Sequence, residues 1–193
     1  MTASNYIILI GRDAGSGPGK LSIDFCNIRG LKSNFLAVEH HLAHSSPDLL
    51  LLSETQLASS ASCDPLTISN YNLLSRFRSK GGVCAYCNTN TPIARLVELE
   101  SPIFYTLWLK ISLSTITIFL CLVYYSPNVN NHIEFFNYLT TSYESLQTSH
   151  PTPKSSLLGT SMHTTRNGST LRGLLLVGLK PFLFPYLTIW NKS

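Results

Sequence analysis

The chain has 193 residues, enough to bury a sizeable core as one domain, and its hydrophobic content of 44% argues against global disorder. Charged residues make up 12%, about half the usual share of a soluble domain. The net charge of +4 excludes a basic footprint over the whole surface, so composition neither suggests nor excludes a nucleic-acid partner.

The first twenty residues are expected to form a flexible leader, because 11–20 hold four glycines and a proline. Residues 21–28 alternate apolar with small or polar side chains, which predicts a strand. Residues 33–44 show the apolar spacing of a helix, with Ser33 as its N-cap. The continuous apolar run 48–54 is typical of a strand buried on both faces of a sheet.

A series of strands follows, and then a helix over 131–147 whose apolar residues have helical spacing. Gly81 and Gly82 predict a hairpin turn between two of the strands. The predicted strands are 71–77, 83–88, 106–112 and 115–125. The order β-α-β, strands, helix predicts a mixed sheet with helices packed outside it.

Polar side chains stand where these strands end. Asn27 ends the first strand, Glu54 ends the continuous apolar strand, and Tyr124 ends the long strand before 126–128. Burying an unpaired carboxylate is costly, so Glu54 either reaches solvent or binds a cation. With Asn27 it offers the oxygen ligands that Mg²⁺ accepts, although Asn27 alone also suits a turn.

Other polar groups favour structural interpretations. Cys84 and Cys87 have metal-site spacing, but within a strand they point to opposite faces, which favours structural cysteines. His40 and His44 share one helical face without a third ligand, which favours a solvated surface. The apolar stretch 171–190 is long enough to cross a membrane, but Lys180 and two prolines interrupt it, so we do not expect a span.

The five cysteines are odd in number and no secretory signal peptide is recognisable, so we expect a reducing, intracellular compartment. They are Cys26, Cys63, Cys84, Cys87 and Cys121.

Four segments, in order and at the right spacing, resemble the endonuclease/exonuclease/phosphatase family, in particular the endonuclease module of non-LTR (jockey-like) retrotransposons. They are "CNIRG" (26–30), "PDLLLLSETQL" (47–57), "FRSKGGVCAY" (77–86) and "LVYYSPN" (122–128). The resemblance covers residues 21–150. It implies the N-terminal half of a four-layer αββα sandwich, a Mg²⁺ or Mn²⁺ cofactor, and DNA as the partner.

The resemblance also implies roles for individual residues. Asn27 and Glu54 would hold the metal, Tyr124 would bond the scissile phosphate, and Lys80 would lie in a loop near DNA. The family further uses an Asp and an Asn in a "GDFN" motif, and a later Asp–His pair, to position and activate the attacking water.

The pattern breaks at that motif, because Thr160 stands in place of the Asp and Met162 in place of the Asn. The later Asp–His pair is absent. Residues 145–193 also contain no Asp or Glu, although they contain five basic residues. One hypothesis explains both facts: 151–193 is the family sequence read in a shifted frame. Codons for 159–168 can yield "GDFNAHHAEW" in the other frame.

This hypothesis predicts a chain without nicking activity and a tail, 151–193, without native fold. Half a sandwich would expose an apolar sheet face, so we expect a monomer or an aggregating species. The alternative is a non-catalytic fragment that binds nucleic acid or metal, or a product without function.

Overall fold

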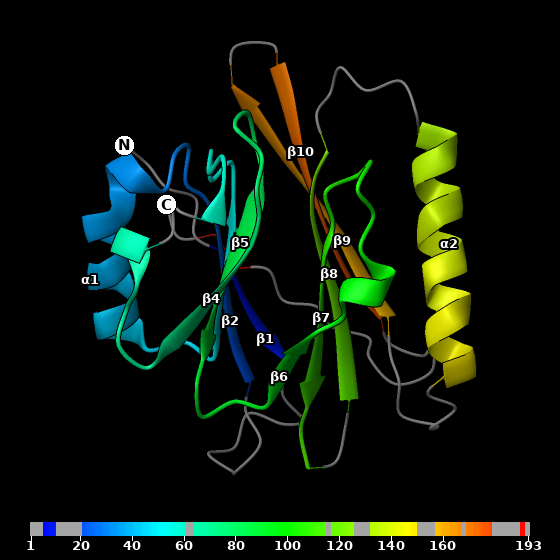
Figure 1. Cartoon of the computed structure of the whole chain (residues 1–193), viewed down its shortest axis with the longest axis horizontal. Helices are drawn as coiled ribbons and strands as arrows, with labels where there is room; N and C mark the ends of the chain where they lie inside the picture. Colours follow the sequence, from blue (N-terminus) through cyan, green and yellow to red (C-terminus); the bar gives the residue numbers. More distant parts are fainter. Residues whose placement is uncertain are drawn as a thin grey trace. The chain divides into compact units, whose positions relative to one another are not determined.

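The computed structural model describes residues 6–10, 21–60, 64–114, 117–125, 132–149, 157–166, 169–178 and 190–191. The chain divides into two compact units, each with its own sheet. The first comprises Met1–Pro92 with Phe184–Ser193, and the second comprises Ile93–Leu183. Figure 1 shows α1 beside the sheet of the first unit and α2 beside the sheet of the second.

Sheet A, in the first unit, has the strand order β11-β1-β2-β3-β5-β4. Among its described strands, β2 and β3 run parallel, and the other neighbouring strands run antiparallel. The strands are β1 (Tyr6–Ile10), β2 (Leu21–Asn27), β3 (Leu49–Ser53), β4 (Tyr71–Arg76), β5 (Val83–Asn88) and β11 (Trp190–Asn191). Parallel strands need a crossover, and helix α1 (Phe35–Ser45) supplies it between β2 and β3.

The core of the first unit lies between α1 and one face of sheet A. Val38 and Leu42 of α1 pack into a cluster that includes Leu50 and Leu52 of β3. A short 3-10 helix, η3 (Asp64–Leu66), contributes Leu66 to the same cluster. All five residues of β3 are buried, which confirms the prediction of a strand buried on both faces.

The other face of sheet A is buried too. Residues of that face, among them Leu21, Ile23, Phe25, Leu49 and Leu51, are at most 6% exposed. These side chains are therefore not exposed, contrary to the expectation of an exposed apolar sheet face.

Sheet B, in the second unit, has the strand order β6-β7-β8-β10-β9, and all its neighbours run antiparallel. The strands are β6 (Ile93–Arg95), β7 (Leu107–Ser112), β8 (Thr117–Tyr125), β9 (Leu157–Arg166) and β10 (Ser169–Gly178). Helix α2 (His132–Ser149) places Phe135, Leu139 and Leu146 against Trp108 and Phe119. A 3-10 turn, η4 (Val97–Leu99), follows β6.

The Tyr138 side chain of α2 forms hydrogen bonds with other segments of the second unit. The Tyr138 hydroxyl accepts a hydrogen bond from Trp108 Nε1 at 2.7 Å and bonds Thr106 Oγ1 at 2.7 Å. It also donates to the Leu99 carbonyl. Burial raises the pKa of this hydroxyl, so it stays protonated and able to donate.

The predicted mixed α/β class is confirmed, and so are the predicted strands and the two helices. The N-cap prediction is wrong. Ser33 lies in a 3-10 turn, η1 (Lys32–Asn34), and donates to the Gly30 carbonyl, while α1 begins at Phe35 after Asn34. The local sequence gave no sign that this turn would precede the helix.

Before the tail, the strands β1 and β6 were not predicted. Tyr6–Ile10 was assigned to the leader but pairs with β2, and β6 is too short to show a pattern. Residues 11–20 lie outside the described residues.

The tail contains β9, β10 and β11. The hypothesis of a shifted frame there concerns the gene and stays a prediction. Of the stretch weighed as a membrane span, 171–178 belong to β10 and 179–189 lie outside the described residues. Within the described part of the chain, no helix has the length and apolar character needed to cross a membrane.

Candidate metal and phosphate site

Three loops meet at one end of sheet A, where β2 and β3 end and the β4–β5 hairpin turns. We call residues 28–31, 54–57 and 77–82 the site loops. The Gly30 N–H donates to the Glu54 carbonyl at 2.7 Å, and the Gln56 N–H donates to the Gly81 carbonyl at 2.8 Å. The middle loop is therefore bonded to both of its neighbours through the backbone.

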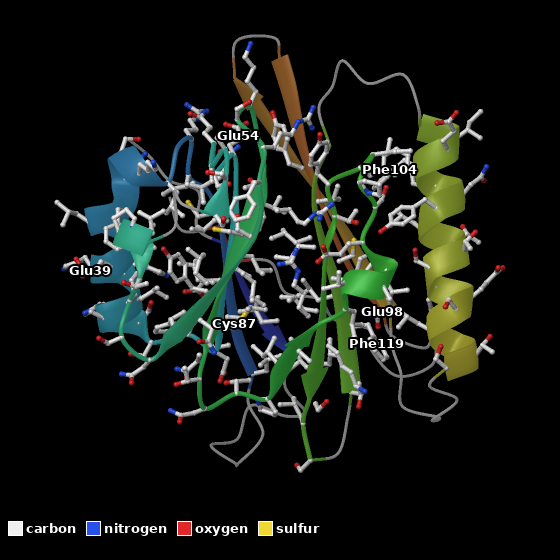
Figure 2. The ribbon with its side chains drawn as sticks, in the orientation of Figure 1. Glu39, Glu54, Cys87, Glu98, Phe104 and Phe119 are labelled. Atoms are coloured by element: carbon white, nitrogen blue, oxygen red, sulfur yellow. The ribbon has the colours of Figure 1, made fainter. Side chains whose placement is uncertain are left out.

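This arrangement brings Asn27 and Glu54 together. Asn27 pairs with Ser53 in the parallel ladder, and Glu54 directly follows the end of β3. Neighbouring strands are about 5 Å apart, so the two backbones are adjacent. Glu54 is half-buried and lies at the upper end of sheet A in Figure 2. The predicted pair thus shares one end of one sheet.

The oxygen atoms at this end suit a hard cation. Asn27 Oδ1 is buried, and among the described residues it has no hydrogen-bond partner. Such an orphaned acceptor is costly unless a ligand or water satisfies it. Mg²⁺ takes oxygen ligands, keeps several waters, and is commonly held by one or two carboxylates. The residues present therefore fit such an ion.

The protein contribution to such a site is small. In the part of the chain that is described, no group of three or more His, Cys, Asp and Glu side chains gathers. A cation held here would rely on Asn27, Glu54 and water.

The site loops also carry basic residues. Lys80 is exposed in the hairpin turn, and its predicted place near DNA stays a prediction. Sequence reasoning missed Arg29 and Arg78, which lie on the same site loops. The site loops thus contain three basic residues and one acid, Glu54. The signal that could have found Arg29 is that, like Lys80, it directly precedes a glycine.

Tyr124 belongs to the second unit. It lies in β8, is half-buried, and its backbone pairs with Gly173 of β10. Its expected contact with the phosphate held near Glu54 stays a prediction. Thr160 and Met162 lie in β9, where they pair with Leu175 and Gly173.

The cysteine pair has a structural setting. Cys84 and Cys87 are buried, and Cys84 packs in the core beneath α1. Burial raises the pKa of the Cys87 thiol to about 12, so it stays protonated near neutral pH. A thiol must be deprotonated to bind a metal, so this setting agrees with structural cysteines.

The histidines of α1 divide into two kinds. His40 and His44 are exposed, with nearly parallel rings whose centroids are 6.3 Å apart, as expected of a solvated face. His41 was not singled out from the sequence, yet its Nε2 lies 2.7 Å from Oδ2 of the buried Asp24. An acid inside the apolar strand 21–27 was the signal for such a partner.

Ser45 also contacts His41, but Ser45, His41 and Asp24 do not form a catalytic triad. Ser45 Oγ is 3.2 Å from the same His41 Nε2 that contacts Asp24, and it also donates to the His41 carbonyl. A Ser-His-Asp triad needs the acid and the serine on different ring nitrogens. The contacts therefore connect α1 to β2 and do not activate a nucleophile.

No protein-family model matches the chain, and no curated protein matches it significantly. Solved structures do match. Selenomethionine-labelled TDP2 from Caenorhabditis elegans has a TM-score of 0.52 and 12% identity, covering 83% of this chain and 64% of that chain. Truncated TDP2 from the same organism has a TM-score of 0.50 and 14% identity, covering 81% of this chain and 82% of that one.

A third match is the AP endonuclease LMAP from Leishmania major, with a TM-score of 0.43 and 17% identity. It covers 74% of this chain, which spans only 46% of the LMAP chain. The TDP2 structures carry the comparison. At such low identity, the likeness to the TDP2 structures shows the fold alone.

Proposed function

We propose that this chain is the N-terminal part of a metal-dependent DNA endonuclease domain from a non-LTR retrotransposon, followed by an out-of-frame tail. The observation that carries the proposal is the meeting of Asn27 and Glu54 at one end of sheet A, with Asn27 Oδ1 buried and in need of a partner. The fold shared with TDP2 and the four resembling segments support it.

On this proposal, Asn27 and Glu54 hold Mg²⁺ or Mn²⁺ through oxygen. Such an ion stabilises negative charge on a phosphate under attack by water. Lys80 lies within the same site loops and offers a cation to the DNA backbone, while Tyr124 donates a hydrogen bond to the scissile phosphate. The ancestral reaction would be a nick in one strand of target DNA, which primes reverse transcription.

The chain lacks the groups that position and activate the attacking water. Thr160 and Met162 replace the Asp and Asn of the family motif. Losing one acid–base group typically lowers a rate by about 10²–10⁴-fold, and here two motif residues are replaced together. We therefore expect cation binding without cleavage.

Two assays on the purified full chain test the proposal. Titration calorimetry should detect Mg²⁺ binding that Glu54→Ala abolishes, while Glu39→Ala, an exposed acid of α1, leaves binding unchanged. A plasmid-nicking assay with Mg²⁺ or Mn²⁺ should show no nicking. Absence of Mg²⁺ binding by the folded chain would refute the metal site, and Glu54-dependent nicking would refute the loss of activity.

The second candidate is a non-catalytic fragment that binds nucleic acid, and the three basic residues of the site loops favour it. Its affinity for DNA would fall steeply as salt is raised, because phosphate contacts release counterions. Salt-dependent DNA binding with a cooperative melt would support it. A chain that binds a hydrophobic dye and shows no melt would instead indicate a product without function.

A further inference from the structure

The site loops contain an unusual backbone feature. Arg29, Glu54 and Gln56 adopt left-handed conformations, with φ of 50°, 56° and 55°. For a residue with a Cβ this conformation is unfavourable, because the Cβ approaches the following carbonyl oxygen. Such outliers gather at functional sites, where the surrounding structure enforces them.

Elsewhere in the described chain, Ser46, Asn70 and Tyr105 are also left-handed, and the first two have local explanations. Ser46 follows the last turn of α1, and its N–H donates to the Leu42 carbonyl, which is the usual end of a helix. Asn70 is in a turn before β4, and Asn tolerates this conformation well. Glu54 does not follow the end of a helix, and glutamate does not share the tolerance of asparagine for a positive φ. Neither explanation therefore applies to Glu54.

The Gly81–Gly82 turn fixes the Glu54 loop from one side. The Gln56 N–H donates to the Gly81 carbonyl, and the Thr55 N–H points to the Gly82 carbonyl at 3.4 Å. Gly30 fixes the loop from the other side through the Glu54 carbonyl. Glu54 therefore cannot relax to a right-handed backbone without breaking bonds on both sides.

Gly82 leaves no room for a side chain. A Cβ there would lie 3.0 Å from Thr55 Oγ1, 3.1 Å from the Arg76 carbonyl oxygen and 3.3 Å from the Arg78 nitrogen. Two of these three are backbone atoms, which cannot rotate away. The φ of 78° at Gly82 also favours glycine. A substitution at this turn would push directly against the loop that carries Glu54.

We infer that the Gly81–Gly82 turn is a positioning element that holds Glu54 in a strained conformation so that its carboxylate and Asn27 Oδ1 face one cation. This inference rests on the proposed metal site and adds the device that builds it. The strain at Glu54 lowers stability and is retained because it aims the carboxylate.

Four variants of the full chain test this by thermal melting without Mg²⁺ and by Mg²⁺ titration. Glu54→Gly and Gln56→Gly relieve equal strain, so each should raise Tm by about 2–4 °C. Only Glu54→Gly should abolish Mg²⁺ binding. Gly82→Ala should lower Tm and weaken Mg²⁺ binding by about 10–100-fold, as supporting residues of metal sites do.

Asn70→Ala is the matched control, because it strains a left-handed position at the opposite end of β4. It should lower Tm and leave Mg²⁺ affinity unchanged. If Gly82→Ala does not fold, Glu54→Asp replaces it: with the backbone held, the shorter carboxylate should bind Mg²⁺ at least about tenfold more weakly.

The possible outcomes distinguish the positioning role of the Gly81–Gly82 turn from the metal site itself. Unchanged Mg²⁺ affinity in Gly82→Ala or in Glu54→Asp overturns the positioning role while the metal site stands. A lower Tm for Glu54→Gly in the absence of Mg²⁺ overturns the claim that the backbone at Glu54 is strained. Absence of Mg²⁺ binding by the folded unsubstituted chain overturns both the metal site and this inference.

Discussion

The buried contact between Asp24 and His41 is a single-residue feature with a measurable consequence. The Asp24 side chain is 7% exposed, and His41 of α1 is its hydrogen-bond partner. We expect His41→Ala to lower the free energy of unfolding by about 1–3 kcal/mol, because it leaves a buried carboxylate without this partner. Urea denaturation measures the change.

His44→Ala is the control, since His44 is exposed on the same helix and should change stability by less than about 0.5 kcal/mol. Asp24→Asn combined with His41→Ala should lose less than the sum of the single changes. If His41→Ala and His44→Ala behave alike, the buried pair does not contribute to stability.

At the scale of elements, one face of α1 packs into the core of the first unit. Leu42 is 1% exposed in the core, whereas Leu36 on the same helix is 78% exposed. Leu42→Ala should lower the free energy of unfolding by about 2–5 kcal/mol, because it leaves a cavity. Leu36→Ala should stay within about 0.5 kcal/mol. Equal effects in chemical denaturation would mean that α1 does not pack as described.

At the scale of the whole molecule, the chain changes character after residue 144, where acidic residues cease. Thr160 and Met162 lie within the same strand, β9, at the positions where the proposed resemblance expects Asp and Asn. We expect the nucleotides encoding 159–168 to spell the family motif in another frame. Sequencing the locus decides this, and any other string would leave the absent acids unexplained.

Local sequence determined much of the fold. The alternation over 21–28, the apolar run 48–54 and the helical spacing over 131–147 correctly predicted β2, β3 and α2. These patterns suffice because alternating or continuous apolar residues report which faces of one element are buried. Asn27 and Glu54 were found in the same way, since a polar residue directly after an apolar strand marks a strand end.

Only the tertiary structure decided the rest, because it depends on contacts between distant segments. Pairing β3 with both β2 and β5 brings Gly30 and Gly81 to the Glu54 loop, which fixes its left-handed backbone. The same pairing leaves Asn27 Oδ1 buried, and the packing of α1 gives Asp24 its histidine. A periodic pattern specifies which face of a strand is apolar. It does not specify which distant backbone will bond the loop that follows, and that bonding shapes the candidate site.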